Sequence, residues 1–228
     1  MTGAHLRRTA FRIPRGMDDG LASLTEPLAC CVRAVRRSGV SRGDTIVIVG
    51  LGAVGRMLTG LFRLRGARVL GFDRLAARTR LAARAWGAAP LPADPKRAAN
   101  EILRRTEGRG ADQVLLSAGS APAFGLALEW VRRGGSIHLF SAPDEGTTVA
   151  FDLNRVYKRE VRVIATYSSS PADLCESFRL LRRGVLPAAE LITHRLPLSR
   201  IAEGLAAIRA GEAIKVILEP GSDAGALR

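Results

Sequence analysis

Short, continuous apolar runs alternate with longer amphipathic segments along most of the chain. Such runs are typical of strands that helices cover on both faces, and their alternation with helices is typical of a doubly wound parallel sheet. The predicted strands are Thr45–Val49, Arg68–Phe72, Ala88–Leu91, Gln113–Leu116, Ser136–Phe140 and Arg162–Thr166. The pattern therefore predicts an α/β fold with a six-stranded parallel sheet.

The segments between these runs carry helix signals. The first helix is expected to begin with Ser23 or Thr25 as its N-cap, with Pro27 in its first turn. The predicted helices are Ser23–Val40, Val54–Arg65, Leu75–Trp86, Lys96–Thr106, Pro122–Val131, Leu153–Lys158 and Pro171–Arg183.

The tail of the chain follows a different pattern. The stretch LITHRLPL predicts a strand that ends at Pro197, and it is followed by a helix over Ser199–Ala210 and a strand over Ala213–Leu218. We therefore expect residues 191–228 to leave the main sheet and to form a separate segment.

The stretch Gly50-Leu51-Gly52-Ala53-Val54-Gly55 follows the first predicted strand and opens a helix. In a GxGxxG turn of this kind the first glycine allows a tight turn, the second lets a pyrophosphate approach the backbone, and the third lets helix and strand pack closely. The free N–H groups of the helix N-terminus favour phosphate. Residues 23–190 are thus predicted to form a dinucleotide-binding Rossmann domain.

An acid, Asp73, ends the second predicted strand, where a carboxylate accepts hydrogen bonds from the adenosine ribose and repels a 2′-phosphate. This position favours NAD over NADP. Arg74 and Arg78 weaken the preference, because arginine nearby can accommodate the 2′-phosphate.

Composition narrows the class of protein. The 228 residues are 47% hydrophobic, which is enough for a substantial core, but no apolar run approaches the length of a membrane span. The N-terminus has no apolar segment of the secretory type. The cysteines Cys30, Cys31 and Cys175 show no CxxC spacing, as expected of a reduced cytoplasmic protein.

The net charge of +14 comes almost wholly from arginine, since only Lys96, Lys158 and Lys215 are lysines. Arginine and alanine enrichment is what GC-rich codons produce. The arginines are spread along the chain as singles and pairs, and aromatic residues make up 5%. Because nucleic-acid binding asks for a clustered basic patch and stacking aromatics, we predict no nucleic-acid or membrane partner and keep a nucleic-acid binder as the least favoured hypothesis.

Several stretches resemble the medium-chain dehydrogenase/reductase superfamily, in particular its zinc-dependent alcohol, polyol and threonine dehydrogenases. They are LTEPLACCVRAVRRSGVSRGDTIVIVGLGAVG, DQVLLSAGS, VRRGGSIHLFS, YKREVRVIATYSSSP and LITHRLPLSRIAEGLAAIRAGEAIKVIL. The resemblance implies NAD-dependent hydride transfer between a secondary alcohol and nicotinamide. It also implies that residues 1–22 lead in from a catalytic domain and that residues 191–228 belong to it.

The resemblance also assigns site residues by position. Glu26 matches an acid beside the catalytic zinc of the polyol branch, and we carry it as the candidate catalytic residue. The candidate coenzyme contacts are Gly50, Gly52, Ala53, Val54, Gly55, Asp73, Arg78, Ala118, Gly119, Phe140, Ser141, Ala142, Thr166, Tyr167 and Ser168. Two of these assignments have a purely structural alternative: Glu26 as an acid that stabilises a helix N-terminus, and Ser168–Ser170 as a helix-capping run.

The family's metal ligands are the main departure. The chain has no His-Glu pair and no four-cysteine lobe, and Glu26 alone cannot hold a zinc ion, which needs about three protein ligands. We therefore predict no metal site in this chain. Two hypotheses stay open beside the least favoured one: an oxidoreductase whose catalytic domain is missing here or supplied by a separate chain, and a non-catalytic NAD-binding module or truncated gene product.

Self-association is a further expectation. The strand over Arg162–Thr166 is expected at a sheet edge, where a second copy can pair with it, and the resemblance implies a homodimer through the same edge. Apolar residues of the tail are expected to face no partner: Ile192, Leu196, Val216 and Leu218.

Overall fold

Six parallel strands form one sheet in the order β3-β2-β1-β4-β5-β6. The structure is a computed structural model and describes residues 3–220. The strands are β1 (Thr45–Val49), β2 (Arg68–Phe72), β3 (Ala89–Pro90), β4 (Ala111–Leu116), β5 (Val131–Leu139) and β6 (Arg162–Ala165). The predicted Rossmann sheet is confirmed. Because the strand order reverses between β1 and β4, a crevice opens at the carboxyl ends of these two strands.

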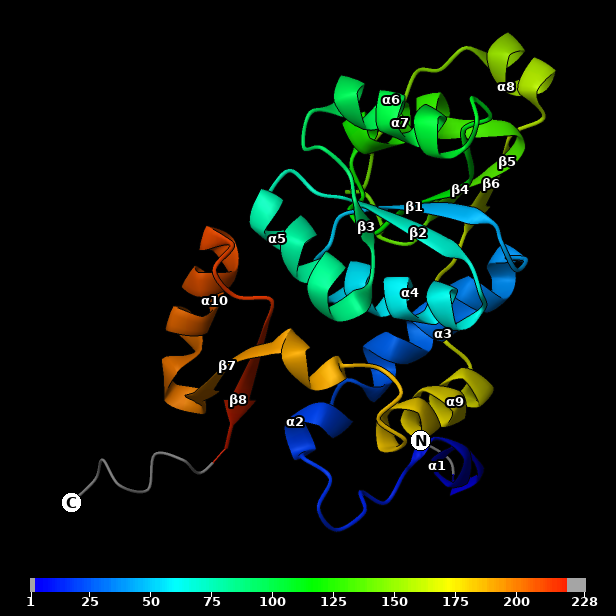
Figure 1. Cartoon of the computed structure of the whole chain (residues 1–228). Coiled ribbons are helices and arrows are strands. Elements are labelled where there is room, and N and C mark those ends of the chain that lie inside the picture. The colour runs from blue at the N-terminus through cyan, green and yellow to red at the C-terminus, as the bar shows by residue number, and fades with distance from the viewer. Residues whose placement is uncertain (1–2, 221–228) are drawn as a thin grey trace.

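Helices cover both faces of the sheet (Figure 1). Helices α3, α4 and α9 lie on one face, and α6 and α7 lie on the other. In β1, Ile46 and Ile48 face the first set, whereas Val47 and Val49 face the second. All residues of β1 are buried, which explains the continuous apolar run in the sequence. The helices of this domain are α3 (Thr25–Ser38), α4 (Ala53–Leu64), α5 (Ala76–Leu81), α6 (Pro95–Arg105), α7 (Ala121–Trp130), α8 (Leu153–Arg159) and α9 (Pro171–Arg182).

Several helix starts follow local capping chemistry. The side chains of Asp94, Ser120 and Ser170 cap α6, α7 and α9, each with proline in the first turn. The capping alternative for Ser170 is thus confirmed. The N-cap prediction for α3 is wrong, because Leu24 occupies that position without a side-chain bond, and the Thr25 hydroxyl donates backward to the Ala22 carbonyl (2.6 Å).

Several elements differ from the prediction. Strand β5 begins at Val131, five residues before the predicted start at Ser136. The helix expected over Leu75–Trp86 divides into α5 and a π-helix over Ala82–Trp86. Two short helices, α1 (Gly3–Thr9) and α2 (Asp19–Ala22), precede α3 where no element was predicted. Both are too short to be stable alone, so their existence depends on the domain they pack against.

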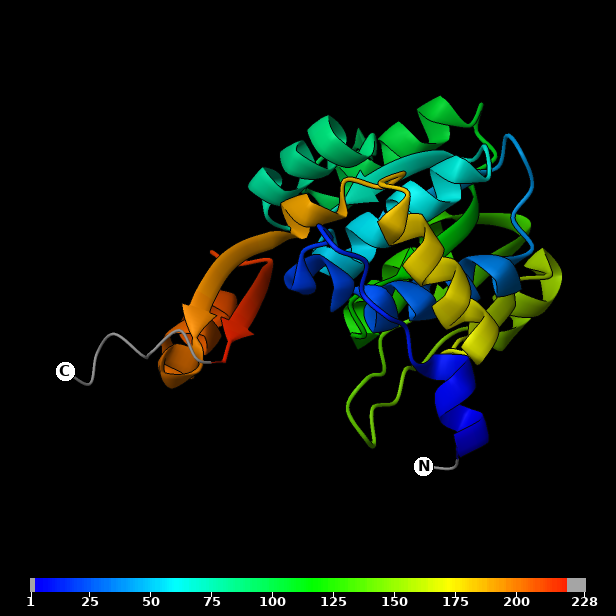
Figure 2. The same ribbon diagram turned by 90° about the horizontal axis from the view of Figure 1, so that it is seen from below.

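A small C-terminal unit stands to one side of the main sheet (Figure 2). In it, β7 (Ile192–Pro197) pairs in parallel with β8 (Lys215–Glu219), and α10 (Ile201–Ala210) packs on them. None of the helices among the described residues is long and apolar enough to cross a membrane.

The prediction that the tail's apolar residues face no partner is wrong for three of them. A Cβ on Gly204 of α10 would lie 2.9 Å from Val216 and 3.4 Å from Leu196, so α10 covers both. Ile192 packs against the core under α3 and α4. The exposed apolar side chains of this unit are Ile201, Leu205 and Ile208 on α10, and Leu198 in the short helical turn just before it.

Candidate functional site

The glycine turn after β1 needs glycine for identifiable steric reasons. Gly50 has a φ of 91°, in the left-handed region. A Cβ on Gly55 would lie 1.9 Å from the Gly50 carbonyl oxygen, so only glycine allows α4 to start so close to the strand. A Cβ on Gly52 would meet nothing within 4 Å, which leaves open space beside the backbone. The turn therefore leaves room for a ligand at Gly52 only.

Side chains from three elements hold the backbone at Gly50 and Leu51. The Leu51 N–H donates to Oδ2 of Asp73 at 2.8 Å, and the Leu51 carbonyl accepts from Nε of Arg56 at 3.0 Å. The other oxygen of Asp73 accepts from the N–H of Leu75 at 2.9 Å. From the end of β4, the Ser117 hydroxyl lies 2.7 Å from the Gly50 carbonyl oxygen. The turn is thus positioned before any ligand arrives.

A cavity of about 770 Å³ opens at this turn, at the switch point of the sheet. Many predicted coenzyme residues line it together: Gly50, Gly52, Ala53, Val54, Gly55, Asp73, Arg78 and Ala118. They come from the ends of β1, β2 and β4 and from the first turn of α4, which presents unpaired N–H groups. The cavity can therefore hold a phosphorylated ligand.

The charges at one end of this cavity are mixed. Asp73 and Arg74 line it beside Arg78. Arg56 lies beneath the turn with 3% of its surface exposed, and one of its terminal nitrogens has no hydrogen-bond partner. Burial lowers the pKa of Arg56, and the charge of Arg78 lowers it further. Sequence reasoning missed Arg56, although its place directly after the third glycine was a usable signal.

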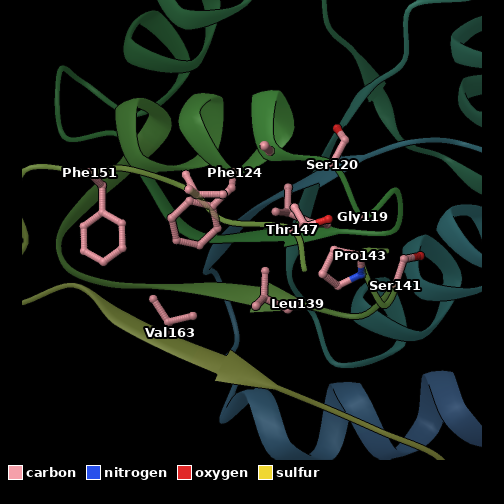
Figure 3. Close-up of a pocket in the computed structure, with 12 residues that line it drawn as sticks. Gly119, Ser120, Phe124, Leu139, Ser141, Pro143, Thr147, Phe151 and Val163 are labelled. Carbon is pink, nitrogen blue, oxygen red and sulfur yellow. The ribbon is translucent and has the colours of Figure 1, made fainter. Parts of the chain in front are cut away.

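A second, smaller cavity of about 370 Å³ adjoins the first at Ser120, which lines both. Figure 3 shows Gly119, Ser120 and Ser141 at one end and the rings of Phe124 and Phe151 with Val163 at the other. Predicted residues Gly119 and Ser141 thus line this cavity and not the larger one. A Cβ on Gly119 would lie 2.7 Å from the Ser141 carbonyl oxygen, so the loops after β4 and β5 touch there.

The remaining predicted coenzyme residues line neither cavity. Phe140 packs partly against the core under α3 and α4, and Ala142 is exposed on the loop after β5. After β6, the N–H of Thr166 donates to the Leu139 carbonyl oxygen (3.2 Å). Tyr167 is 89% exposed, and Ser168 has a φ of 61°. The assignment of Phe140, Ala142 and residues 166–168 to a coenzyme site stays a prediction.

Glu26 lies in the first turn of α3, in a separate shallow cavity of about 420 Å³. Its carboxylate accepts a hydrogen bond from the Cys30 thiol at 3.2 Å, and Cys30 also interacts with the hydroxyl of Ser169. Burial, with Glu26 next, raises the pKa of Cys30 to about 11. The raised pKa disfavours the thiolate, which makes Cys30 a poor nucleophile.

The described residues do not fit a zinc ion. Among residues 3–220, no three His, Cys, Asp or Glu side chains gather closely enough to hold a metal. The Cys30 thiol donates to the Glu26 carboxylate, and Asp19 lines the same cavity. His138 is buried with its Nε2 3.0 Å from the Ser136 hydroxyl, and His194 lies in the C-terminal unit. We therefore assign no chemical step of this chain to a metal.

Fold and site together define a Rossmann-type α/β domain with a preformed glycine turn at its switch point. Residues 53–183 match the family model described as zinc-binding dehydrogenase, and the chain belongs to this family. Among curated proteins, it is 30% identical to a sorbitol dehydrogenase from Halalkalibacterium halodurans, over 94% of this chain and 63% of the relative. It is 29% identical to an L-threonine 3-dehydrogenase from Bacillus velezensis, over 93% of this chain and 62% of the relative.

Solved structures show the same relationship. The alcohol dehydrogenase TADH from Thermus sp. ATN1 superimposes with a TM-score of 0.83 at 26% identity, covering 91% of this chain and 60% of that one. A zinc-binding dehydrogenase from Sinorhizobium meliloti 1021, solved with NADP bound, gives a TM-score of 0.82 at 26% identity, covering 92% of this chain and 62% of that one. The chain thus spans somewhat over half the length of the relatives it matches.

Proposed function

We propose that the chain binds a nicotinamide dinucleotide in the larger cavity and serves as the coenzyme part of an alcohol or polyol dehydrogenase. The observation that carries the proposal is the joining of the Gly50–Gly55 turn, the open N-terminus of α4 and the carboxylate of Asp73 in one cavity of about 770 Å³. The named activities of the relatives, sorbitol and threonine dehydrogenation, support an alcohol as the substrate class.

The geometry suggests an orientation for the coenzyme. Its pyrophosphate would lie at Gly52, where the backbone is open, and would accept hydrogen bonds from the first N–H groups of α4. Its adenosine ribose would lie at Asp73, whose oxygens each accept one backbone bond and keep a further lone pair for ribose hydroxyls. Because a carboxylate repels a 2′-phosphate, we propose NAD as the preferred coenzyme.

The nicotinamide would then extend toward the loops after β5 and β6. In this proposal Phe140, Ser141 and Ala142 lie along one side of the ring, with Thr166, Tyr167 and Ser168 near its reactive face. When bound, the ring accepts a hydride from the carbinol carbon of a secondary alcohol or returns it to the ketone. The chain's own share is to bind and orient the coenzyme, and Glu26 is the proposed acid nearest the substrate.

Titration of the purified chain with NADH and NADPH, followed by nicotinamide fluorescence, tests coenzyme binding. We expect saturable binding of NADH, tighter than that of NADPH. No saturable binding of either coenzyme would refute the proposal, and tighter NADPH binding would refute the role given to Asp73.

Catalysis needs groups that act on the alcohol, and we propose that a further stretch of polypeptide or a separate chain supplies them. The competing function is a non-catalytic NAD-binding module, which the lack of a metal-binding group among residues 3–220 favours. Assays of NAD reduction with sorbitol and L-threonine, with and without added zinc, separate the two. NADH binding without turnover under any of these conditions favours the binding module for this chain.

We also propose that the chain forms a homodimer in a reducing compartment such as the cytoplasm. The strand β6 lies at the edge of the sheet, and Val163 on it is 47% exposed. Exposed Leu153 and Tyr157 on α8 add apolar surface before this edge. Unpaired edges and contiguous apolar surface both favour association with a second copy.

A further inference from the structure

The amino edge of the sheet, opposite the coenzyme cavity, collects arginines that are far apart in the sequence. In a doubly wound fold each helix runs back from the carboxyl edge to the amino edge, so the last helical turns meet there. Helices α4, α6 and α8 each have arginine in the last turn, at Arg63, at Arg104 and Arg105, and at Arg159. A cation at a helix C-terminus is favourable, which explains why each of these helices ends this way.

Two hollows lie along this edge. One, of about 450 Å³, is lined by Arg63, Arg68 and Arg105. The other, of about 540 Å³, is lined by Arg109, Arg132, Arg133 and Arg159, with Glu129 as its acidic residue. The end of α6 separates them, because Arg105 faces the first and Leu103 faces the second. We call the arginines that line the two hollows the arginine edge: Arg63, Arg68, Arg105, Arg109, Arg132, Arg133 and Arg159. The helix dipoles do not explain Arg68, Arg132 and Arg133, which lie on β2 and β5.

The carboxylates at this edge do not neutralise it. Arg104 and Arg105 share Glu101, with N···O distances of 2.7 and 2.6 Å. In the same way Arg109 and Arg132 share Asp112, at 3.7 and 2.6 Å. Each shared carboxylate leaves one positive charge over.

The other arginines of the edge form no ion pair among the described residues. Arg63 donates to the Trp86 carbonyl at 3.1 Å, and Arg68 donates to the Thr45 hydroxyl at 2.8 Å. Arg159 donates to the carbonyls of Leu128 (2.7 Å) and Val131. Neutral acceptors orient these guanidinium groups but leave their charge in place. Burial, together with the charges of Arg155 and Arg133, lowers the pKa of Arg159.

We propose that the arginine edge binds the phosphate backbone of double-stranded nucleic acid. From β2 to β5 the edge crosses three strand spacings, or about 15 Å. A duplex carries about nine charges over that length, so one duplex can engage both hollows, whereas a small anion fills only one. Arginine also suits phosphate because its planar fork donates two parallel hydrogen bonds.

The lining of the hollows indicates which nucleic acid fits. No aromatic residue lines either of them, so bases have no surface on which to stack. Binding would then be independent of sequence and stronger for a duplex than for a single strand. If the four arginines that form no ion pair among the described residues, Arg63, Arg68, Arg133 and Arg159, each neutralise one phosphate, the logarithm of affinity should fall with a slope of about −3.6 against the logarithm of salt. Affinity would drop about 100-fold between 50 and 200 mM salt. The arginines are scattered in sequence, but the fold gathers them, which removes one reason for predicting no nucleic-acid partner.

Fluorescence anisotropy with a labelled duplex of about 20 base pairs, a single strand of equal length and anionic vesicles tests this proposal on the full chain. The triple variant Arg63→Gln, Arg68→Gln, Arg133→Gln should weaken duplex binding at least tenfold and flatten the salt slope by about 2.7. The single variant Arg133→Gln, at an exposed side chain, should flatten it by about 0.9 and leave folding intact.

The matched control removes the same charge elsewhere, in the triple variant Arg80→Gln, Arg84→Gln, Arg209→Gln, whose members are exposed and outside both hollows. It should bind the duplex within about threefold of the parent. Equal weakening by both triple variants would show an effect of net charge alone and overturn the proposal. No duplex binding at 50 mM salt would overturn it too, as would tighter binding to the single strand or to vesicles. Saturating NADH should leave duplex affinity unchanged, because the coenzyme cavity lies at the opposite edge, so failure here is separable from failure of coenzyme binding.

Discussion

Replacing Asp73 with asparagine removes one carboxylate oxygen from a residue that uses both. In the structure, Oδ2 accepts the N–H of Leu51 at 2.8 Å and Oδ1 accepts that of Leu75 at 2.9 Å. Asparagine offers one acceptor and one donor, so in either orientation one backbone N–H faces another donor. Asp73 is only 8% exposed, and water cannot easily replace the lost acceptor.

The loss of this bond sets the expected magnitude. Hydrogen bonds to charged groups contribute about 1.5–3 kcal/mol, so the free energy of unfolding should fall by about that amount. For a chain of this size the corresponding decrease in Tm is about 3–12 °C. Thermal unfolding followed by circular dichroism measures it. The control is Asp44→Asn, in the surface turn before β1, where the single bond accepted from the Ser41 N–H (2.8 Å) can be kept by the amide oxygen. That variant should unfold within about 0.5 kcal/mol of the parent.

The same substitution should change coenzyme preference. Two unit charges about 4 Å apart interact by about 4 kcal/mol at an effective dielectric constant near 20, so a carboxylate strongly disfavours a 2′-phosphate beside it. Asp73→Asn removes this repulsion and leaves Arg74 and Arg78 in the cavity. The ratio of NADPH to NADH affinity should rise at least tenfold, or about 1.4 kcal/mol. An unchanged ratio would show that Asp73 does not face the ribose, and a Tm equal to that of the control would show that it does not hold the turn.

Three further predictions follow from the same structure. Gly55→Ala should lower both the Tm and NADH affinity, because its methyl group would lie 1.9 Å from the Gly50 carbonyl oxygen. Gly52→Ala should keep the Tm and lower only NADH affinity. Undiminished NADH affinity in Gly52→Ala would contradict the proposed position of the pyrophosphate at Gly52. Burial, with the charge of Arg162 next, lowers the pKa of His138 from 6.5 to about 4, so its contribution to stability is present above about pH 6.5 and is lost as the pH falls toward 4. The free energy of unfolding, measured at several pH values, should therefore fall by about 2 kcal/mol between pH 7.5 and 5. This fall should disappear in His138→Gln and persist in His194→Gln. An equal fall in both variants would show that it does not come from His138. Val163→Pro should convert a homodimer to monomer in light scattering coupled to size exclusion, because proline removes a strand donor at the β6 edge, and a parent that is already monomeric at micromolar concentration rules the dimer out.

The strands show how much the sequence determines. The limits of β1 and β2 agree with prediction to the residue, because strands buried on both faces must be continuously apolar and flanking turns end them. The glycine turn was equally predictable, since the steric demand at Gly55 is local and no other residue meets it. Short elements such as α2 were missed because contacts with remote residues help to hold them: Asp18 caps α2 and also pairs with Arg195 of β7 at 2.6 Å.

The candidate site, too, was predictable only in part from the sequence. Sequence spacing identified the turn and the acid after β2, and in the structure both line one cavity. It did not reveal that Arg56 and Asp73 hold the two backbone polar groups of Leu51 from two sides, because that depends on how α4 packs beside β2. Nor did it show that α10 would cover Leu196 and Val216.

The arginines give the clearest contrast. Their number and the net charge of +14 are properties of the sequence, and there they appear scattered. Only the tertiary structure brings Arg63, Arg105 and Arg133 to one edge, because antiparallel packing of helices on parallel strands returns every crossover to the same end of the sheet. Local spacing determines hydrogen bonds and apolar faces within an element, whereas distances between charges remote in sequence are decided by the packing of whole elements.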